Sequence, residues 1–246
     1  MRKFRFYILA IAAVCAVACA DEAKKSSDIP EFETFEYELT DEGNYSFTIS
    51  YEHITNTSDS EAFAIIEELN YQATFGEYAL EEQNLQSSAE ALVADAMANM
   101  EAYNYADMFC EMHIYQVASI IRNKSIVCYD TFIETNFGGV HPIVTHIYEC
   151  YDIASGNAYD FSYLHDVEWY DALVAVIYEK LAAEHGGHLF VTSADDLHLP
   201  LVIYLTDGGI VFQYQTFEIA DGSLGSIGVE LTDAELEAVG APLVWK

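Results

Sequence analysis

Residues 203–214 read Ile-Tyr-Leu-Thr-Asp-Gly-Gly-Ile-Val-Phe-Gln-Tyr, two apolar runs joined by Thr-Asp-Gly-Gly. Glycine adopts positive φ without a steric penalty, and the tight turns of β-hairpins require such a conformation. The aromatic and β-branched residues on both sides of the turn favour strands. We therefore predict a hairpin whose strands cover residues 199–205 and 210–214.

Other parts of the chain repeat this combination of strand-like runs and turns. Further strands are expected over residues 33–39, 45–54, 109–121, 125–136, 143–153 and 229–231. Helices are expected over residues 58–70, 87–105 and 168–185, with a helical turn from 232, and the first two begin at a capping-box sequence. Because hairpins dominate and helices do not alternate strictly with strands, we predict an α+β fold with antiparallel sheets and a few packed helices.

The chain is strongly acidic. Of its 246 residues, 41 are Asp or Glu and 9 are Lys or Arg, for a formal charge of −32. A basic patch for nucleic acid or for an anionic lipid surface is therefore excluded, because like charges repel. Hydrophobic residues make up 52% and aromatic residues 14%, which predicts a packed core and not a disordered acidic tail.

The first residues are typical of a bacterial lipoprotein leader. A basic start is followed by the apolar run Phe6–Ala18, which is too short to span a bilayer comfortably but fits a signal peptide. The run ends directly before Cys19, as in a lipobox, so residues 1–18 are predicted to be a signal peptide and Cys19 the lipidated N-terminus. Residues 19–30 then form a polar tether. We expect an exported protein that is lipid-anchored in the bacterial cell envelope, at the outer membrane.

The remaining cysteines allow one disulfide. If residues 124–136 and 143–153 form a hairpin turning at Gly138-Gly139, Cys128 and Cys150 face each other directly. Opposed cysteines lie close enough to bridge. The alternative interpretation is two small buried thiols.

One loop stands out as a candidate site. Gly138 and Gly139 permit positive φ, and His141 is held in extended geometry by Pro142, so the loop is sharply shaped. His141 either contacts a ligand or hydrogen-bonds the loop to itself. A zinc site needs four converging ligands, and only Cys110 and His113 have the usual spacing, so no metal site is predicted. No nucleotide-binding or hydrolase motif is present, and no cofactor is expected.

Several motifs in order resemble a known family. The Gly-Gly-Val-His-Pro loop at 138–142, the segment Tyr151–Gly156 and the stretch Ile203–Ala220 resemble the C-terminal domain of unknown function of RsiV-type proteins, which also accompanies the peptidoglycan deacetylase PdaC. The resemblance covers roughly residues 105–238. It implies a PdaC-like N-terminal part over residues 31–136 and an RsiV-like domain over residues 137–246.

The resemblance implies work in the cell envelope. RsiV-like proteins bind lysozyme, a cationic protein, and complementary charge speeds such an encounter. We therefore expect a non-catalytic envelope protein that binds lysozyme, another cationic protein or cell-wall glycan (peptidoglycan). Its membrane contact would be the lipid anchor only. The alternative is an envelope enzyme acting on peptidoglycan, with His141 and nearby carboxylates in a cleft.

Overall fold

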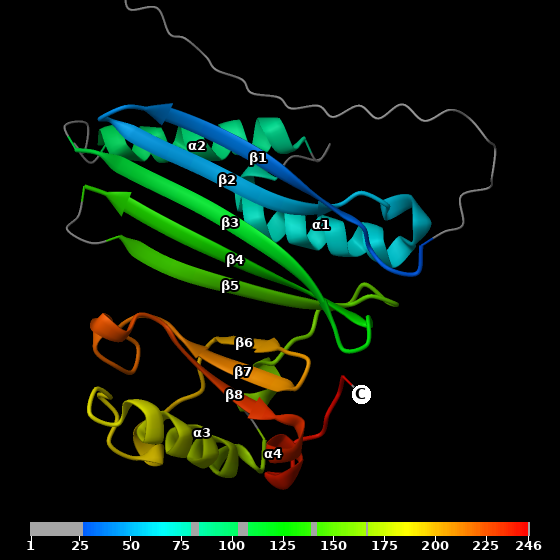
Figure 1. The fold of residues 1–246 in the computed structure, drawn as a ribbon, viewed down its shortest axis with the longest axis vertical. Helices are drawn as coiled ribbons and strands as arrows, with labels where there is room; N and C mark the ends of the chain where they lie inside the picture. The colour runs from blue at the N-terminus through cyan, green and yellow to red at the C-terminus, as the bar shows by residue number, and fades with distance from the viewer. Residues whose placement is uncertain (1–26, 80–83, 103–107, 139–141, 166, 246) are drawn as a thin grey trace, which may run out of the picture.

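The structure is a computed structural model that describes residues 27–79, 84–102, 108–138, 142–165 and 167–245. It contains two sheets of five and three strands, each packed against helices, lying side by side (Figure 1). The predicted α+β class is confirmed. Within the described residues, no helix is both long and apolar enough to cross a membrane.

The larger sheet has the strand order β1-β2-β3-β4-β5. Its strands are β1 (Phe32–Asp41), β2 (Tyr45–Ile54), β3 (Cys110–Ile121), β4 (Ile126–Phe137) and β5 (Ile143–Asp152). All neighbouring pairs are antiparallel except β2 and β3, which are parallel. A parallel pair needs a crossover connection, and α1 (Glu61–Phe75) and α2 (Leu85–Ala102) lie in that connection.

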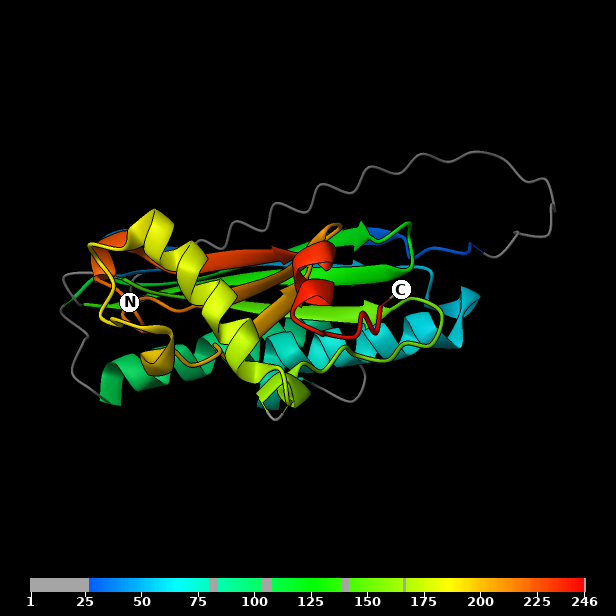
Figure 2. The same ribbon diagram turned by 90° about the horizontal axis from the view of Figure 1, so that it is seen from below.

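Both crossover helices pack on the same face of this sheet (Figures 1 and 2). The reason is the alternation within the strands: Phe47, Ile49 and Tyr51 of β2 are completely buried, whereas the residues between them are not. Apolar residues of α2, such as Val93, join the same core. The opposite face of β2 and β3 carries no described helix.

The helices begin at different residues from those predicted. The first was expected to start at Ser58, but Thr57–Asp59 form a 3₁₀ turn and Ser60 caps α1 instead, accepting a hydrogen bond from the Ala62 N–H at 3.2 Å. The second starts before Ser87, whose N–H donates to the Asn84 side chain at 3.0 Å. Both predicted caps are wrong because several Ser and Asn residues compete for the same role.

The smaller sheet has the order β6-β7-β8, and all its pairs are antiparallel. Its elements are β6 (Val202–Leu205), β7 (Gly209–Tyr214), β8 (Ile227–Thr232), α3 (Tyr170–His185) and α4 (Asp233–Ala238). The predicted hairpin is present, but β6 starts three residues late because Pro200 has no N–H to give to a ladder. The helical turn predicted from Thr232 is present as α4, and a capping box between Thr232 and Glu235 begins it.

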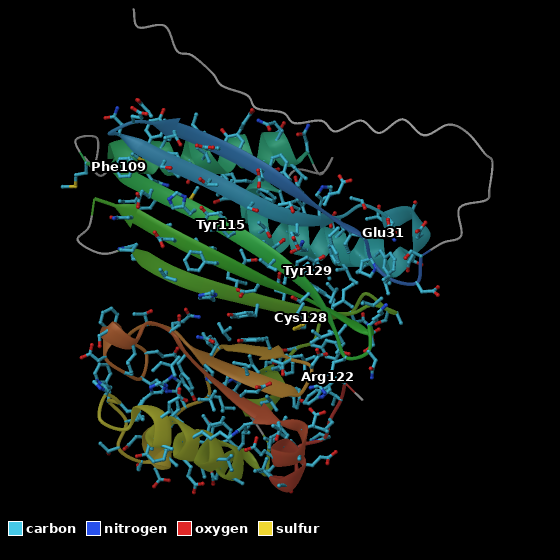
Figure 3. All side chains as sticks on the ribbon, viewed as in Figure 1. Glu31, Phe109, Tyr115, Arg122, Cys128 and Tyr129 are labelled. Carbon is cyan, nitrogen blue, oxygen red and sulfur yellow. A yellow bond between two sulfur atoms is a disulfide. The ribbon has the colours of Figure 1, made fainter. Side chains whose placement is uncertain are left out.

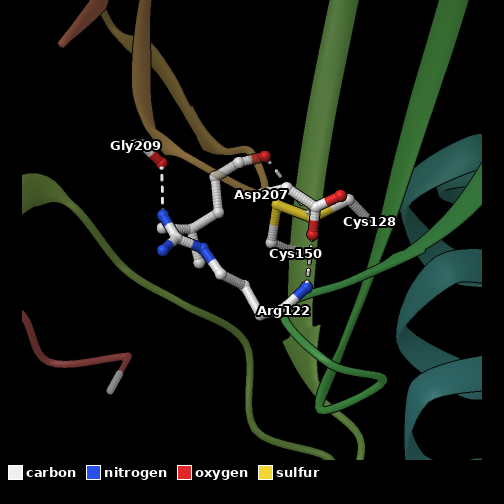
Figure 4. The surroundings of a disulfide bond; sticks show 6 residues. Arg122, Cys128, Cys150, Asp207 and Gly209 are labelled. Carbon is white, nitrogen blue, oxygen red and sulfur yellow. Dashed lines mark hydrogen bonds between the residues drawn. A yellow bond between two sulfur atoms is a disulfide. The ribbon is translucent and has the colours of Figure 1, made fainter. Parts of the chain in front are cut away.

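The two sheets meet along β5 and β6. Arg122, in the turn between β3 and β4, donates to both carboxylate oxygens of Asp233 at 2.7 and 3.0 Å and to the Gly209 carbonyl at 2.9 Å. Its backbone N–H donates to Asp207 at 2.7 Å (Figure 4). The guanidinium is nearly buried, so this bidentate pair ties the larger sheet to the start of α4.

The sheets do not divide where the sequence suggested. A boundary between residues 136 and 137 would separate β4 from β5, yet these strands pair along ten residues in one sheet. Gly138 directly follows β4 within the larger sheet and marks no division between the sheets. The second sheet and its helices begin only after β5, and Ile126 and Cys150 of the larger sheet contribute to their core.

Candidate binding face of the five-stranded sheet

On the face of the larger sheet opposite the helices, every second residue of the strands points away from the helices, and those not covered by the smaller sheet reach solvent. On β3, Met112, Ile114 and Gln116 point to the helices and are buried, whereas Tyr115 and Val117 are 43% and 57% exposed. Tyr115 lies near the middle of the sheet (Figure 3). We call this surface the open face.

A row of aromatic rings crosses the open face from β3 to β6. Successive ring centroids are separated by 6.1 Å for His113–Tyr115, 6.3 Å for Tyr115–Phe132, 5.2 Å for Phe132–His146, 5.7 Å for His146–Tyr148 and 3.7 Å for Tyr148–Tyr204. The strand register explains the row, because Tyr115 lies opposite Phe132 and Phe132 lies opposite His146. We call these six residues the aromatic row.

Polar groups join the row where the two sheets meet. The Nδ1 atom of His146 lies 3.1 Å from Oδ1 of Asp130 and 3.3 Å from the hydroxyl of Tyr148. Burial raises the pKa of Tyr148, and the neighbouring Tyr204 and Asp130 raise it further. The phenol therefore stays neutral and offers a hydrogen-bond donor beside the carboxylate.

Carboxylates surround the aromatic row. The acidic residues whose alternation places them on the open face include Glu36, Glu38, Glu111, Asp130 and Glu134. Among the described residues, the Lys and Arg side chains lie elsewhere, in the turn at Arg122 and Lys124 and on α3 at Lys180. The open face is therefore acidic and aromatic, a combination that suits a cationic partner through charge and cation–π contacts.

The predicted cysteine pair is found as a disulfide. Cys128 and Cys150 oppose each other in the register of β4 and β5 and are bridged. Their side chains are on the open face but lie under β6, where the Cys128 Sγ is 3.9 Å from the Leu205 carbonyl (Figure 4). The bridge closes the hairpin at the junction and is not part of the exposed surface.

The predicted loop is described only at its ends. Cys19, Gly139 and His141 lie outside the described residues. Gly138 has φ +77°, and a Cβ there would collide with the Met108 side chain, so this glycine is needed for both conformation and packing. Pro142 is exposed. The structure therefore gives Gly138 a structural role and leaves the role of His141 as a prediction.

The structure does not bring the zinc-spaced pair together. Cys110 is buried towards the helices, whereas His113, three residues on, is on the open face, because an odd separation in a strand reverses the side. Within the described residues, no cluster of three His, Cys, Asp or Glu side chains could hold a metal ion.

Two shallow hollows also occur on the surface. One, of about 440 Å³, lies between Ser27, Asp59 and Lys124, and the other, of about 420 Å³, lies between Lys180 and Glu230. Neither is lined by Gly138 or Pro142.

The aromatic row was not predicted from the sequence. The pairs His113/Tyr115 and His146/Tyr148 were the signal that could have indicated it, because each pair lies two residues apart in a predicted strand and therefore shares one face.

No protein-family model and no curated protein matches this chain. Solved structures do match its fold. A crystal structure of a DUF3298 family member from Bacteroides fragilis NCTC 9343 aligns with a TM-score of 0.70 and 17% identity, over 88% of this chain and 98% of that one. This chain has the DUF3298 fold. A DUF3298 family protein from Pseudomonas aeruginosa PAO1 aligns with a TM-score of 0.55 and 14% identity, over 86% and 94% of the two chains.

DUF3298 is a domain of unknown function, so this likeness concerns the fold alone. It extends over both sheets, because the alignments cover most of each chain. The five-stranded and three-stranded sheets are therefore parts of one shared architecture. The resemblance to RsiV-type and PdaC-type proteins is compatible with this fold.

Proposed function

We propose that this chain is a non-catalytic, lipid-anchored protein of the bacterial cell envelope that binds a cationic protein on its open face. The observation that carries the proposal is the aromatic row on an uncovered, acidic sheet face. The resemblance to RsiV-type proteins makes lysozyme the first partner to test. The acyl group on Cys19 would be the only membrane contact, and the polar residues 19–30 would separate the folded part from the outer membrane.

Charge supports a partner of opposite sign. Removal of residues 1–18 takes away three of the nine bases and none of the 41 acids, which leaves a formal charge of −35. Two of the remaining bases, Arg122 and Lys180, are already paired with Asp233 and Glu235. The field of the folded part therefore attracts cations over long distances, and the aromatic row supplies apolar contact after the encounter.

The test is binding of lysozyme to the protein without its lipid, at low and at moderate salt. We expect binding that weakens as salt rises. Replacing Glu111 and Glu134 by Lys should weaken binding by about tenfold, because both carboxylates lie on the open face. Tyr115→Ser should weaken binding while leaving the salt dependence unchanged.

The matched control replaces Glu90 and Glu179 by Lys. These exposed residues lie on α2 and α3, so the control changes the net charge equally but leaves the open face intact. We expect a much smaller effect. Equal effects of the two pairs would show that only the net charge matters, and no binding at low salt would eliminate lysozyme as the partner.

Cell-wall glycan is the second candidate partner. The observation that favours it is the presence of Ser46, Thr48 and Ser50 on the same face as the aromatic row, since sugar hydroxyls bind such groups while sugar rings contact aromatic side chains. Co-sedimentation with insoluble peptidoglycan would test it. Binding that resists high salt and is lost in Tyr115→Ser would support glycan over a cationic protein.

The catalytic alternative is an envelope enzyme that acts on peptidoglycan through His141 and nearby carboxylates. It predicts that His141→Ala abolishes turnover of peptidoglycan fragments without lowering the melting temperature. If the wild-type protein releases no product from peptidoglycan, the enzyme hypothesis is rejected and the binding hypothesis is unaffected.

A further inference from the structure

Large apolar side chains are exposed together at one end of the molecule. Their exposed fractions are 46% for Met108, 42% for Phe109, 70% for Ile143, 61% for Phe190, 94% for Leu201 and 72% for Phe217. We call these six residues the distal patch. Soluble proteins rarely expose so many large apolar side chains in one region unless the region contacts something else.

The strand directions place the patch at a single end. Phe109 directly precedes β3, Ile143 begins β5, Leu201 directly precedes β6, and Phe217 follows the end of β7. The turn at Arg122 lies at the opposite end of these strands, and Figure 3 shows Phe109 and Arg122 far apart along β3.

Several contacts connect the parts of the patch across the two sheets. Met108 packs against Gly138 beside the start of β5. The Gln215 side chain donates to the His146 carbonyl of β5 at 3.4 Å, which joins the two sheets at this end. The Phe190 N–H donates to the Ile219 carbonyl at 2.8 Å, which fixes Phe190 beside the segment that carries Phe217.

Phe217 shows that exposure here is imposed by the backbone. Its φ is +69°, a conformation that costs free energy for a bulky residue, and its ring is still largely exposed. The ring lies over Gly222, where any Cβ would collide with it. A strained residue whose side chain gains little burial in the folded protein is a sign of function.

The charge around the patch indicates the chemistry of its partner. The carboxylates of Asp41, Glu42, Glu218 and Asp221 lie at this end. The Lys and Arg residues of the described part of the chain lie on the turn at Arg122 and on α3, away from it. An apolar centre with an acidic rim is complementary to a segment that is apolar on one face and basic on the other.

The anchored end is the opposite one. The Ser27 N–H, at the start of the described chain, donates to Asp59 at 3.0 Å, and both residues line a hollow with Lys124 beside the Arg122 turn. The distal patch therefore points away from the point where the tether joins the folded part, which places it towards a partner and not towards the anchoring bilayer.

We propose that the distal patch binds the apolar face of a cationic amphipathic helix. This inference rests on the proposed function for the lipid anchor and for the positive sign of the partner, and it concerns a different surface from the open face. Leu201 and Phe217 insert between the apolar side chains of the helix, and the rim carboxylates pair with its Lys or Arg residues.

The experiment measures binding of two Lys/Leu peptides with one composition. In one peptide the leucines lie along a single helical face, and in the other the order is scrambled. We expect the amphipathic peptide to bind at least about tenfold more tightly. Leu201→Ser and Phe217→Gly should each weaken its binding by about tenfold while leaving the weak binding of the scrambled peptide unchanged.

The variants separate binding from folding. Glycine accepts positive φ freely, so Phe217→Gly should fold at least as stably as the wild type while losing the ring. Val244→Ser is the control, because Val244 is 56% exposed but lies beside Trp245, which contacts Arg122 at the other end. It should bind the amphipathic peptide as the wild type does.

Several results would overturn the proposal. Equal affinity for the two peptides would mean that charge alone binds them. Tight binding to phosphatidylcholine vesicles that is lost in Leu201→Ser would assign the patch to a bilayer. Concentration-dependent dimerisation lost in the same variant would assign it to a second copy. If the open-face variants lose only lysozyme binding, the helix-binding role of the distal patch is unaffected. If binding of the amphipathic peptide is lost when Glu111 and Glu134 are replaced, the peptide binds on the open face and not on the distal patch.

Discussion

The two sheets are joined to their helices by different chemistry. Between α1 and the larger sheet, Glu67 and Asn70 of the helix and Gln116 of β3 are polar yet almost completely buried. Between α3 and the smaller sheet, Leu173, Ile177 and the other buried residues of the helix are apolar. The interface between α1 and the larger sheet thus contains a polar network, whereas the interface between α3 and the smaller sheet is an apolar core, called the dry core below.

The polar network is connected throughout. Tyr51 donates to Glu67 at 2.9 Å, and the Ile54 N–H donates to the other Glu67 oxygen at 2.6 Å. The Gln116 amide lies 2.9 Å from the Asn70 carbonyl oxygen and 3.0 Å from the Thr131 hydroxyl. Such a network fixes the orientation of the helix on the sheet, but its contribution to stability depends on the protonation of its groups. The contribution of an apolar core depends instead on how closely its side chains fit together.

The largest effect is expected in the dry core. Phe212→Ala on β7 removes a completely buried ring and should lower the free energy of unfolding by about 4 kcal/mol. The loss should be equal at about pH 5 and about pH 7 because the side chain that is removed carries no titrating group. Urea unfolding measures it, with the exposed Phe190→Ala as control. A loss below about 1 kcal/mol would mean that this core is not tightly packed.

The link between the two sheets comes next. Arg122→Met leaves the Asp233 carboxylate without its bidentate partner in a largely buried position and should cost about 3 kcal/mol. Lys124→Met, in the same turn but exposed, should cost less than about 0.5 kcal/mol. Unfolding followed by two probes, one in each sheet, should show transitions that separate in Arg122→Met. Coincident transitions with an unchanged midpoint would show that the pair does not couple the sheets.

The polar network should respond to pH. Burial raises the pKa of the Glu67 carboxyl to about 7, from 4.5 in the unfolded chain. Between these values the folded state holds a proton that the unfolded state has released, so this stabilisation is complete below pH 4.5 and is lost as pH rises through about 7. The loss amounts to about 3 kcal/mol.

Glu67→Gln tests this, because glutamine resembles the protonated carboxyl at every pH. The wild type should lose stability relative to the variant as pH rises through that window. If the difference in stability between the wild type and Glu67→Gln does not change with pH, the pKa of Glu67 is not raised by folding.

The smallest effect concerns the hairpin at the junction. Replacing Cys128 and Cys150 together by Ser should lower the free energy of unfolding by about 2 kcal/mol, because the bridge restricts the unfolded chain. Thiol counting by mass spectrometry should find two more free thiols after reduction of the wild type. An identical count before and after reduction would show that the bridge does not form in the protein.

Much of the fold followed from local sequence. The hairpin at Asp207–Gly209, the helical turn from Thr232 and the opposition of Cys128 to Cys150 were all predicted, because each depends on residues that are close in the chain or paired through one turn. The helix starts were less accurate, since neighbouring Ser, Asp and Asn residues can all serve as caps. The parallel pairing of β2 with β3 was missed because it joins segments separated by two helices.

The candidate site was less predictable than the fold. The sequence directed attention to the loop at Gly138–Pro142, because glycine and proline are conspicuous in a sequence. The aromatic row draws on three strands of one sheet and on Tyr204 of the other, and each ring alone looks like an ordinary core residue. Only the register decides that these rings lie side by side on the uncovered face.

The sequence by itself determined the class of fold and the acidic character, and it predicts an export leader, since these depend on composition, periodicity and short motifs. The tertiary structure alone decided which face of the larger sheet stays open, where the two sheets divide and which apolar residues gather at the distal end. The physical reason is that side-chain alternation defines two faces of a strand without saying which one a helix will cover. That choice depends on contacts between different elements, such as Glu67 of α1 with Tyr51 of β2.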